Sequence, residues 1–184
     1  MDATGVDVPP DTAVIVIDVQ QALCEGAQAV WDGAGTIARI NQVTAQARRR
    51  GVPVVMVQHE EADGAFRHGG AGWQLAQGLQ VEPGDVRVGK TTPDAFWKTD
   101  LQARLQALGA KRLVVCGMQT EFCVDTTTRA ALRHGYPVTL VSDGHTTVGH
   151  AALAAPQIIA HHNATLPAIG SFGPRVALAE AAAL

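Results

Sequence analysis

The chain has 184 residues, of which 47% are hydrophobic and 17% charged, and its formal net charge is −3. This length suits one ordinary domain and the apolar content supplies a sizeable core, so we expect a single domain over residues 1–184. The basic residues are scattered, apart from the run Arg48–Arg50 at the end of a predicted helix, where cations suit the helix dipole. This charge pattern argues against a nucleic-acid partner.

The cysteine content and the apolar runs indicate a cellular setting. Three cysteines are an odd number and few for a secreted disulfide scaffold, so we expect reduced thiols. The segment Met1–Ala13 has neither the basic nor the apolar region of a signal peptide. No apolar run approaches the length of a membrane span. The expected location is the cytoplasm, with no membrane partner.

Short apolar runs rich in β-branched residues predict buried strands. In chain order they cover residues 12–19, 52–58, 85–90, 112–118 and 136–143, and residues 166–170 are a candidate sixth strand. Helical spacing of apolar residues appears between them, over residues 36–51, 101–109, 120–134 and, on both sides of Pro156, 150–166. This alternation predicts an α/β fold with a mainly parallel sheet. The long segment from His59 to Gly84 is predicted to be a functional loop or lid.

Reactive side chains stand where the predicted strands end. In open parallel sheets, ligands bind beyond the carboxyl ends of the strands. Asp18 stands at the end of the first run with Gln20 just after it, His59 follows the second run, Lys90 ends the third, and Cys123 opens the helix after the fourth. Carboxylate, ammonium and thiol therefore converge on one edge as a candidate base, charge stabiliser and nucleophile. An Asp at a strand end can equally cap a loop, and a Lys there can be solvated, so neither identifies a site alone.

The sequence assigns different roles to the cysteines. Cys116 lies inside an apolar strand and is expected to act as a small hydrophobe. Cys123 falls in the first helical turn if Thr120 is the N-cap, where the helix dipole lowers a thiol pKa. Glu121 and Asp125 oppose this effect, and Lys90 would offset them. Cys24 is assigned no role.

Further aromatic and histidine side chains are candidates for the pocket wall. Trp73, Phe96 and Trp97 are either substrate walls or packing residues. His145 is expected to line the pocket or a subunit interface. His161 and His162 are expected to be solvated or at an interface. The C-x6-C spacing is not that of a dithiol redox motif, and no G-x-G-x-x-G follows the first strand, so redox and dinucleotide-binding functions are disfavoured.

Three sequence blocks together resemble the isochorismatase-like cysteine hydrolase family. They are VIVIDVQ from Val14, VGKTTPDAF from Val88 and VVCGMQTEFCVDTTTRAALRHGYPVTLVSD from Val114, and the resemblance covers residues 12–166. The stretches QH at Gln58, GGAGWQL and IIAHHNATL look most like a metal-free, amidase-type branch with streptothricin hydrolase-like members.

The resemblance implies a three-layer Rossmann-like fold with a six-stranded, mainly parallel sheet flanked by helices. It maps a catalytic triad onto Asp18, Lys90 and Cys123. It also implies a cis peptide bond between Met118 and Gln119, whose N–H would join that of Cys123 in an oxyanion hole. Family members usually form dimers or tetramers, so we expect a homo-oligomer. The tentative substrate pocket comprises Gln20, His59, Trp73 and Phe96.

The predicted activity is hydrolysis of a C–N bond in a small primary amide or lactam, through a Cys123 thioester. Nicotinamidases of this family bind a metal through an Asp and two His residues. His59 and His68, with Glu60 and Asp63 between them, copy that spacing poorly, so we predict no metal and no cofactor. True isochorismatases lack the nucleophilic cysteine. Vinyl-ether hydrolysis and a catalytically silent, ligand-binding member remain the alternatives.

Overall fold

A computed structural model describes residues 8–27 and 29–184, so most of the segment used for the signal-peptide prediction lies outside the described residues. The strands are β1 Thr12–Ile17, β2 Val54–His59, β3 Val86–Lys90, β4 Arg112–Met118, β5 Val138–Thr146, β6 Gly149–His150, β7 Leu153–Ala154 and β8 Val176–Ala179. The helices are α1 Gln21–Cys24, α2 Gly33–Arg49, α3 Leu101–Ala107, α4 Asp125–Arg133 and α5 Ala155–Ala168, with a π-helical turn, η1, over Thr120–Val124 and a 3-10 turn, η2, over Ala181–Ala183.

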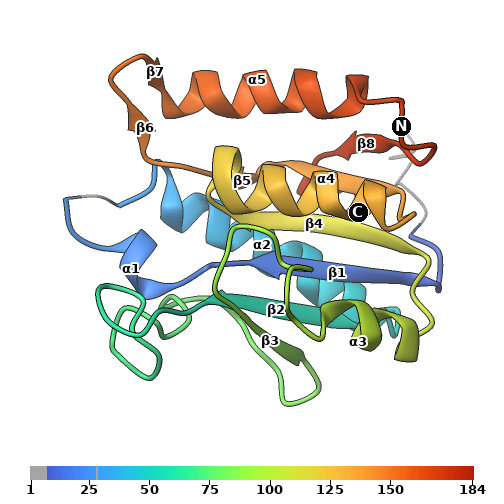
Figure 1. Cartoon of the computed structure of the whole chain (residues 1–184), viewed down its shortest axis with the longest axis horizontal. Coiled ribbons are helices and arrows are strands. Elements are labelled where there is room, and N and C mark those ends of the chain that lie inside the picture. The colour runs from blue at the N-terminus through green and yellow to red at the C-terminus, as the bar shows by residue number, and fades with distance from the viewer. Residues whose placement is uncertain (1–7, 28) are drawn as a thin grey trace.

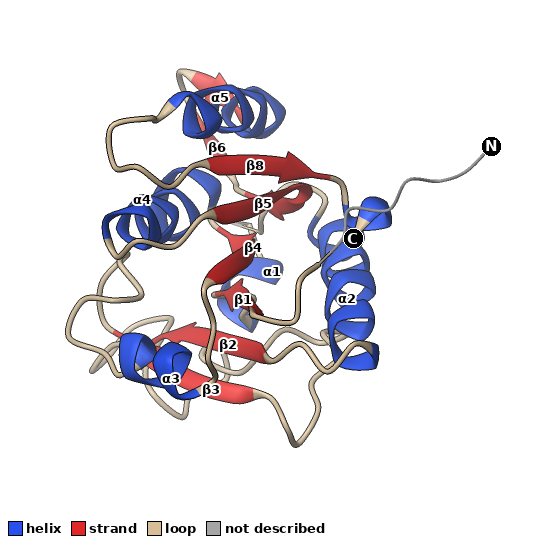
Figure 2. Ribbon diagram, turned by 90° about the vertical axis from the view of Figure 1, so that its right-hand side faces the viewer, coloured by secondary structure: helices blue, strands red, loops and turns tan. Residues whose placement is uncertain are grey.

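The main sheet has six strands in the order β3-β2-β1-β4-β5-β8, and every neighbouring pair is parallel. Helix α2 covers one face, whereas α3 and α4 cover the other (Figure 2). The predicted α/β fold with a six-stranded parallel sheet flanked by helices is confirmed. Parallel strands buried on both faces need continuous apolar sequence, and β1 (TAVIVI) is buried at every position.

The alternation of side chains along β1 divides the core into two clusters. Ala13, Ile15 and Ile17 pack on the α3 and α4 side, whereas Val14 and Val16 pack on the α2 side. Each cluster collects apolar residues from the neighbouring strands and from the covering helices. The sheet is therefore a rigid centre that fixes where its strand ends lie.

Helix α2 is amphipathic and packs its apolar face against the sheet. Its buried positions Ile37, Ile40 and Val43 recur at helical spacing and pack against the sheet. The basic run at its end is structural: Arg48 pairs with Asp85 at 2.6 Å, and the Arg50 guanidinium donates to the Leu184 carbonyl at 2.7 Å.

The C-terminal third differs from the sequence-based prediction. Residues 166–170 do not form a strand, because Leu166–Ala168 complete α5, and the sixth strand is β8. Pro156 stands in the first turn of α5, where its missing N–H costs nothing, so the helix does not continue on both sides of it. The residues just before form the β6–β7 hairpin, and β5 runs on past Asp143 to Thr146.

All six strands of the sheet end on the same side, which is the left edge in Figure 1. Helix α1, the segment after β2 and the β6–β7 hairpin gather at this edge (Figure 1). Residues 60–85 contain no helix or strand of the main sheet, as the loop prediction expected. Among the described residues, no helix is both long and apolar enough to span a bilayer.

Candidate active site

Asp18 is placed by a tight turn directly after β1. Its backbone has a φ of 49°, a left-handed conformation that is unusual for a non-glycine residue and often marks a functional position. Its N–H donates to the Val57 carbonyl at 2.9 Å, and its carbonyl accepts from the Gln20 N–H at 2.8 Å. The carboxylate is only 1% exposed. The turn therefore holds an acidic side chain inside the protein, at the sheet edge.

Lys90, the last residue of β3, provides the countercharge. Its Nζ lies 2.6 Å from Asp18 Oδ2, and its side chain is fully buried. The ammonium also donates to the Thr92 carbonyl at 3.1 Å and to Cys123 Sγ at 3.3 Å. An ammonium has three hydrogens to donate, so the buried ion pair and these contacts fix its position.

Cys123 reaches the same cluster from η1, the turn between β4 and α4. The pKa of its thiol is raised to about 12, chiefly by burial and also by the Asp18 charge, while the Lys90 charge opposes this rise. The prediction of a lowered thiol pKa was therefore wrong. Thr120 does not cap this turn, and Gln119 precedes it without a side-chain capping bond, so burial outweighs any helix-end effect.

The Asp18 carboxyl is affected by the same surroundings. Burial raises its pKa, while the Lys90 charge and the hydrogen bond with the Cys123 thiol lower it. A carboxylate with a raised pKa is a stronger base than a solvated one. The thiol is thus protonated at neutral pH, and a base made stronger by burial lies in the same cluster, joined to the thiol through the Lys90 ammonium.

The backbone before the turn has a special geometry. The peptide bond between Met118 and Gln119 is cis. Gly117 just before it has a φ of 128°, and a Cβ there would lie 2.1 Å from the Ile17 carbonyl oxygen. Only glycine lets β4 approach β1 this closely at the point where the chain turns toward Cys123.

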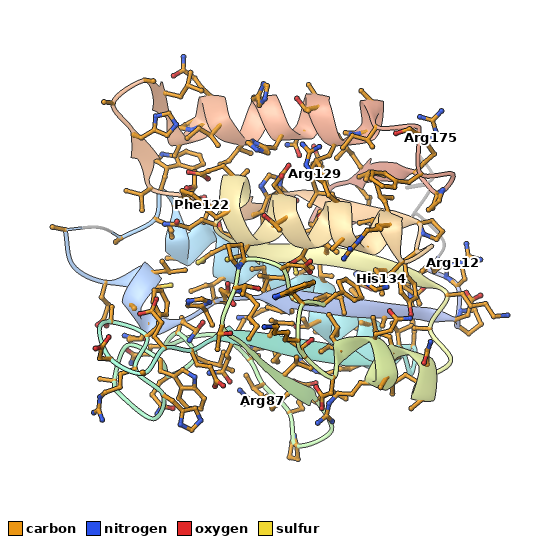
Figure 3. The ribbon with its side chains drawn as sticks, in the orientation of Figure 1. Arg87, Arg112, Phe122, Arg129, His134 and Arg175 are labelled. Atoms are coloured by element: carbon orange, nitrogen blue, oxygen red, sulfur yellow. The ribbon has the colours of Figure 1, made fainter. Side chains whose placement is uncertain are left out.

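The thiol opens into a pocket of about 200 Å³. Its walls are mainly apolar and comprise Asp18, Leu23, His59, Phe66, Pro93, Gln119, Phe122 and Cys123. Phe122 is 53% exposed and forms part of the rim. Figure 3 shows its label beside the start of α4, on the side where the strands end. The site therefore combines a neutralised charge pair at its base with an apolar wall.

His59 is a polar side chain of this wall and lies beside the Asp18–Lys90–Cys123 cluster. Its Nδ1 lies 3.4 Å from Lys90 Nζ, and its Nε2 lies 3.3 Å from Glu61 Oε1. Because an ammonium only donates, Nδ1 accepts, and the proton on Nε2 faces the Glu61 carboxylate. The edge of the ring meets Phe66, which the loop after β2 supplies.

Three other residues predicted to line this pocket do not. Gln20 is fully buried and bridges β1 to β2, because its amide bonds the N–H and the carbonyl of His59. Phe96 is 7% exposed and stacks on His134, since its segment turns into the core. Trp73 lies on the opposite side of β2, in a second cavity, and Trp97 borders a third.

The second cavity is larger, at about 580 Å³. It lies beside β2 and β3, where Gln58, Glu60, Trp73 and Arg87 line it, and the described residues of its lining include no Cys, Ser or Thr. His68 stacks on Trp73 there, with its Nε2 3.7 Å from Glu60 Oε2. Within residues 8–27 and 29–184, no three His, Cys, Asp or Glu side chains are grouped as metal ligands would be.

The remaining cysteines and histidines lie outside the pocket. Cys116 is fully buried within β4, and burial raises its pKa to about 12. Burial likewise raises the pKa of Cys24, to about 11. His145 is buried and is not among the described residues that line the pocket at Cys123, contrary to the first of its two predicted roles, because β5 continues through it and packs it beneath η1. The wall residues that the sequence did not predict are Leu23, Phe66, Pro93 and Phe122, although Pro93 and Phe122 lie within the sequence blocks given above.

Comparison with known proteins identifies the class to which this fold and site belong. The isochorismatase domain matches residues 12–160, and the chain belongs to the isochorismatase family. A crystal structure titled as an isochorismatase family protein superimposes with a TM-score of 0.84 at 32% identity, covering 92% of this chain and 98% of that one. The resemblance to isochorismatase-like cysteine hydrolases is thereby confirmed.

Two curated relatives are similar to this chain over most of its length. Streptothricin hydrolase of Streptomyces noursei is 42% identical over 79% of this chain and 52% of its own length. Ureidoacrylate amidohydrolase RutB of Methylobacterium radiotolerans is 28% identical over 89% of this chain and 75% of its own. The chain spans about half the length of the streptothricin hydrolases that it matches.

Proposed function

We propose that this protein is a cysteine hydrolase that cleaves the C–N bond of a small primary amide or lactam through a Cys123 thioester. The observation that carries the proposal is the buried cluster in which the Lys90 ammonium contacts both the Asp18 carboxylate and the Cys123 sulfur, at the base of a pocket. The names of the two curated relatives, a streptothricin hydrolase and an amidohydrolase, support the same reaction class.

The first step is proton transfer from the Cys123 thiol to Asp18. A thiol with a pKa of about 12 loses its proton too rarely to water at neutral pH. The Asp18 carboxylate has a raised pKa and lies close enough for its charge to act on the thiol, so we assign it the proton as the sulfur attacks. Lys90 holds the carboxylate in place and remains beside the sulfur as its charge develops.

Acylation then follows from the geometry of the pocket. The sulfur adds to the amide carbon, and the carbonyl oxygen becomes an oxyanion, for which the N–H groups of Gln119 and Cys123 are the proposed donors. Asp18 returns its proton to the nitrogen, the C–N bond breaks, and an amine leaves, or ammonia if the amide is primary. The product of this step is a thioester on Cys123.

Deacylation uses the same carboxylate a second time. Asp18 takes a proton from a water molecule as the water oxygen adds to the thioester carbon. The C–S bond breaks, the carboxylic acid forms, and the proton returns from Asp18 to the sulfur. Enzyme and protonation state are then restored.

The pocket wall favours an acyl group that is small and uncharged. Leu23, Phe66, Pro93 and Phe122 offer apolar contacts, and the charges of Asp18 and Lys90 already neutralise each other. A charged acyl group would lose its hydration here without gaining a partner. A volume of about 200 Å³ accommodates a short aliphatic chain or a single ring.

The test combines ammonia release with trapping of the intermediate. The protein is incubated with a panel of small neutral amides and lactams, quenched in acid, and digested for peptide mass spectrometry. We expect ammonia from some primary amides and an acyl adduct on the peptide that contains Cys123. Cys123→Ser should abolish turnover, whereas Cys24→Ser should keep it. Turnover that persists in Cys123→Ser would overturn the thioester route.

A further inference from the structure

A buried chain of hydrogen bonds leads from α5 to the turn that carries Cys123. Asn163 Oδ1 lies 3.0 Å from His145 Nε2, and His145 Nδ1 lies 2.9 Å from the Thr120 hydroxyl. His145 is 2% exposed, and Thr120 is fully buried. Thr120 is the first residue of η1, and neither it nor His145 takes part in the reaction steps above.

The donor and acceptor of each hydrogen bond in this series can be assigned by starting from Asn163. The Asn163 amide Nδ2 donates to the Ser142 carbonyl at 2.9 Å, which turns its Oδ1 toward His145. A carbonyl oxygen only accepts, so His145 carries its proton on Nε2. Its Nδ1 then has a lone pair, and the Thr120 hydroxyl donates to it. A single tautomer of His145, with the proton on Nε2, therefore satisfies the hydrogen bonds of Asn163, His145 and Thr120 together.

A second contact holds the neighbouring residue of the turn. The Thr147 hydroxyl, just after β5, donates to Glu121 Oε1 at 2.8 Å. Two consecutive residues at the start of η1 are thus attached to the end of β5, one through His145 and one through Thr147. The sulfur of Cys123 lies in the same single turn, so its distance from Asp18 and Lys90 depends on these attachments.

We infer that Asn163, His145 and Thr120 form a positioning relay that fixes the nucleophile turn, with His145 as a neutral, single-tautomer link. The inference rests on the proposed function, because it assigns the relay to holding Cys123 against Asp18. The three residues act by positioning Cys123, since none of them is among the described residues that line the pocket. A displacement of a reacting group by about 1 Å costs on the order of 100-fold in rate, which is the scale of effect available to such a relay.

The surroundings of His145 keep the link neutral. Its pKa is lowered to about 4, chiefly by burial and also by the nearby His162. The hydrogen bond with Asn163 and the charge of Asp143 act in the opposite direction. His145 therefore neither gains nor loses a proton at neutral pH, and it does not serve as a second catalytic base.

The first experiment removes the Thr120 hydroxyl at constant shape. Thr120→Val should lower kcat by 10- to 100-fold with KM nearly unchanged, and should slow iodoacetamide alkylation of Cys123 by a similar factor. Thr120→Ser restores the hydroxyl and should recover most of the loss. Thr128→Val is the matched control, because Thr128 is also fully buried but its hydroxyl has no hydrogen-bond partner among the described residues.

The second experiment observes the tautomer directly. Nitrogen-15 NMR of labelled histidine should show His145 in the wild type as the neutral form with its proton on Nε2. Asn163→Ala should produce a mixture of tautomers together with slower Cys123 alkylation. His145→Asn, whose amide can still accept from Thr120, should retain more Cys123 reactivity than His145→Gln, whose amide reaches toward Asn163 instead.

The outcomes separate this inference from the proposed function. If wild-type Cys123 reacts no faster than Cys24, the proposed function fails. If wild-type Cys123 reacts fast and Thr120→Val leaves alkylation and kcat at the wild-type level, the relay is overturned and the function stands. A wild-type His145 with its proton on Nδ1, or with both nitrogens protonated at neutral pH, also overturns the relay.

Discussion

Cys116 and Cys123 lie on either side of the end of β4, and burial raises the pKa of both thiols to about 12. Their neighbours differ. The Cys116 sulfur contacts the Ile15 carbonyl within an apolar cluster, whereas the Cys123 sulfur contacts the Lys90 ammonium, which pairs with Asp18. Acidity alone does not separate a structural thiol from a candidate nucleophile here. The difference is a base that can remove the proton, together with a pocket that admits a substrate.

The largest expected effect comes from exchanging each thiol in turn. Cys123→Ser should reduce amide hydrolysis by at least about 10³-fold, because a serine hydroxyl is a much poorer nucleophile beside a carboxylate base. Cys116→Ala should keep the activity while lowering the free energy of unfolding by about 1 kcal/mol. Steady-state ammonia release and urea denaturation measure the two effects. Loss of activity in a folded Cys116→Ala would abolish the distinction between the two cysteines.

The next largest effect is on stability and comes from the Asp18–Lys90 ion pair, which lies beside Cys123 and has no counterpart beside Cys116. Lys90→Met leaves Asp18 buried without its partner and should lower the free energy of unfolding by about 3 to 5 kcal/mol at neutral pH. The double variant Asp18→Asn with Lys90→Met removes the orphaned charge and should regain most of that loss. Urea denaturation of the wild type, Lys90→Met, Asp18→Asn and the double variant completes the cycle. Equal stability of the single and double variants would mean that the pair is not buried as described.

A smaller effect comes from His145 beneath the Cys123 turn. Its pKa in the folded protein is about 4, below the ordinary value of 6.5, so between these pH values the unfolded chain binds the proton and the folded protein does not. Stability should therefore fall as the pH drops from 6.5 to 4, by up to about 3 kcal/mol from this residue. His145→Asn should flatten that dependence, whereas His161→Asn, on an exposed side chain, should not.

The smallest expected effect lies at the pocket rim. Phe122→Ala should raise KM by up to about 10-fold through lost apolar contact, with unfolding free energy changed by less than about 0.5 kcal/mol because the ring is half exposed. Trp97→Ala is the matched control, since Trp97 is similarly exposed but borders a different cavity. Equal changes in KM for the two variants would remove Phe122 from the substrate site.

The strands of the sheet could be read from the sequence because strands buried on both faces need uninterrupted apolar runs. The same reasoning placed Asp18 and Lys90 at one edge, since parallel strands end together. The sixth strand was misplaced because the apolar residues of 166–170 also suit the end of a helix, and only packing against β5 selects β8.

The properties of individual side chains were harder to predict. The pKa of Cys123 depends on how deeply the turn is buried, which local helix rules do not contain. Phe96 is the last residue of the sequence block that contains Lys90, yet its ring turns into the core. His145 looked like a pocket residue because β5 was predicted to end before it. These are consequences of tertiary packing, and no periodicity in the chain encodes them.

The most direct test of the account is the pH dependence of alkylation at each cysteine, measured by peptide mass spectrometry in wild type and Asp18→Asn. The account predicts that Cys123 in the wild type reacts fastest, and that its rate rises as Asp18 loses its proton, above the range of an ordinary carboxyl. In Asp18→Asn the rate at neutral pH should fall by at least about 10-fold, leaving only the rise toward the thiol pKa. Identical pH profiles in the two proteins would contradict the claim that Asp18 activates Cys123.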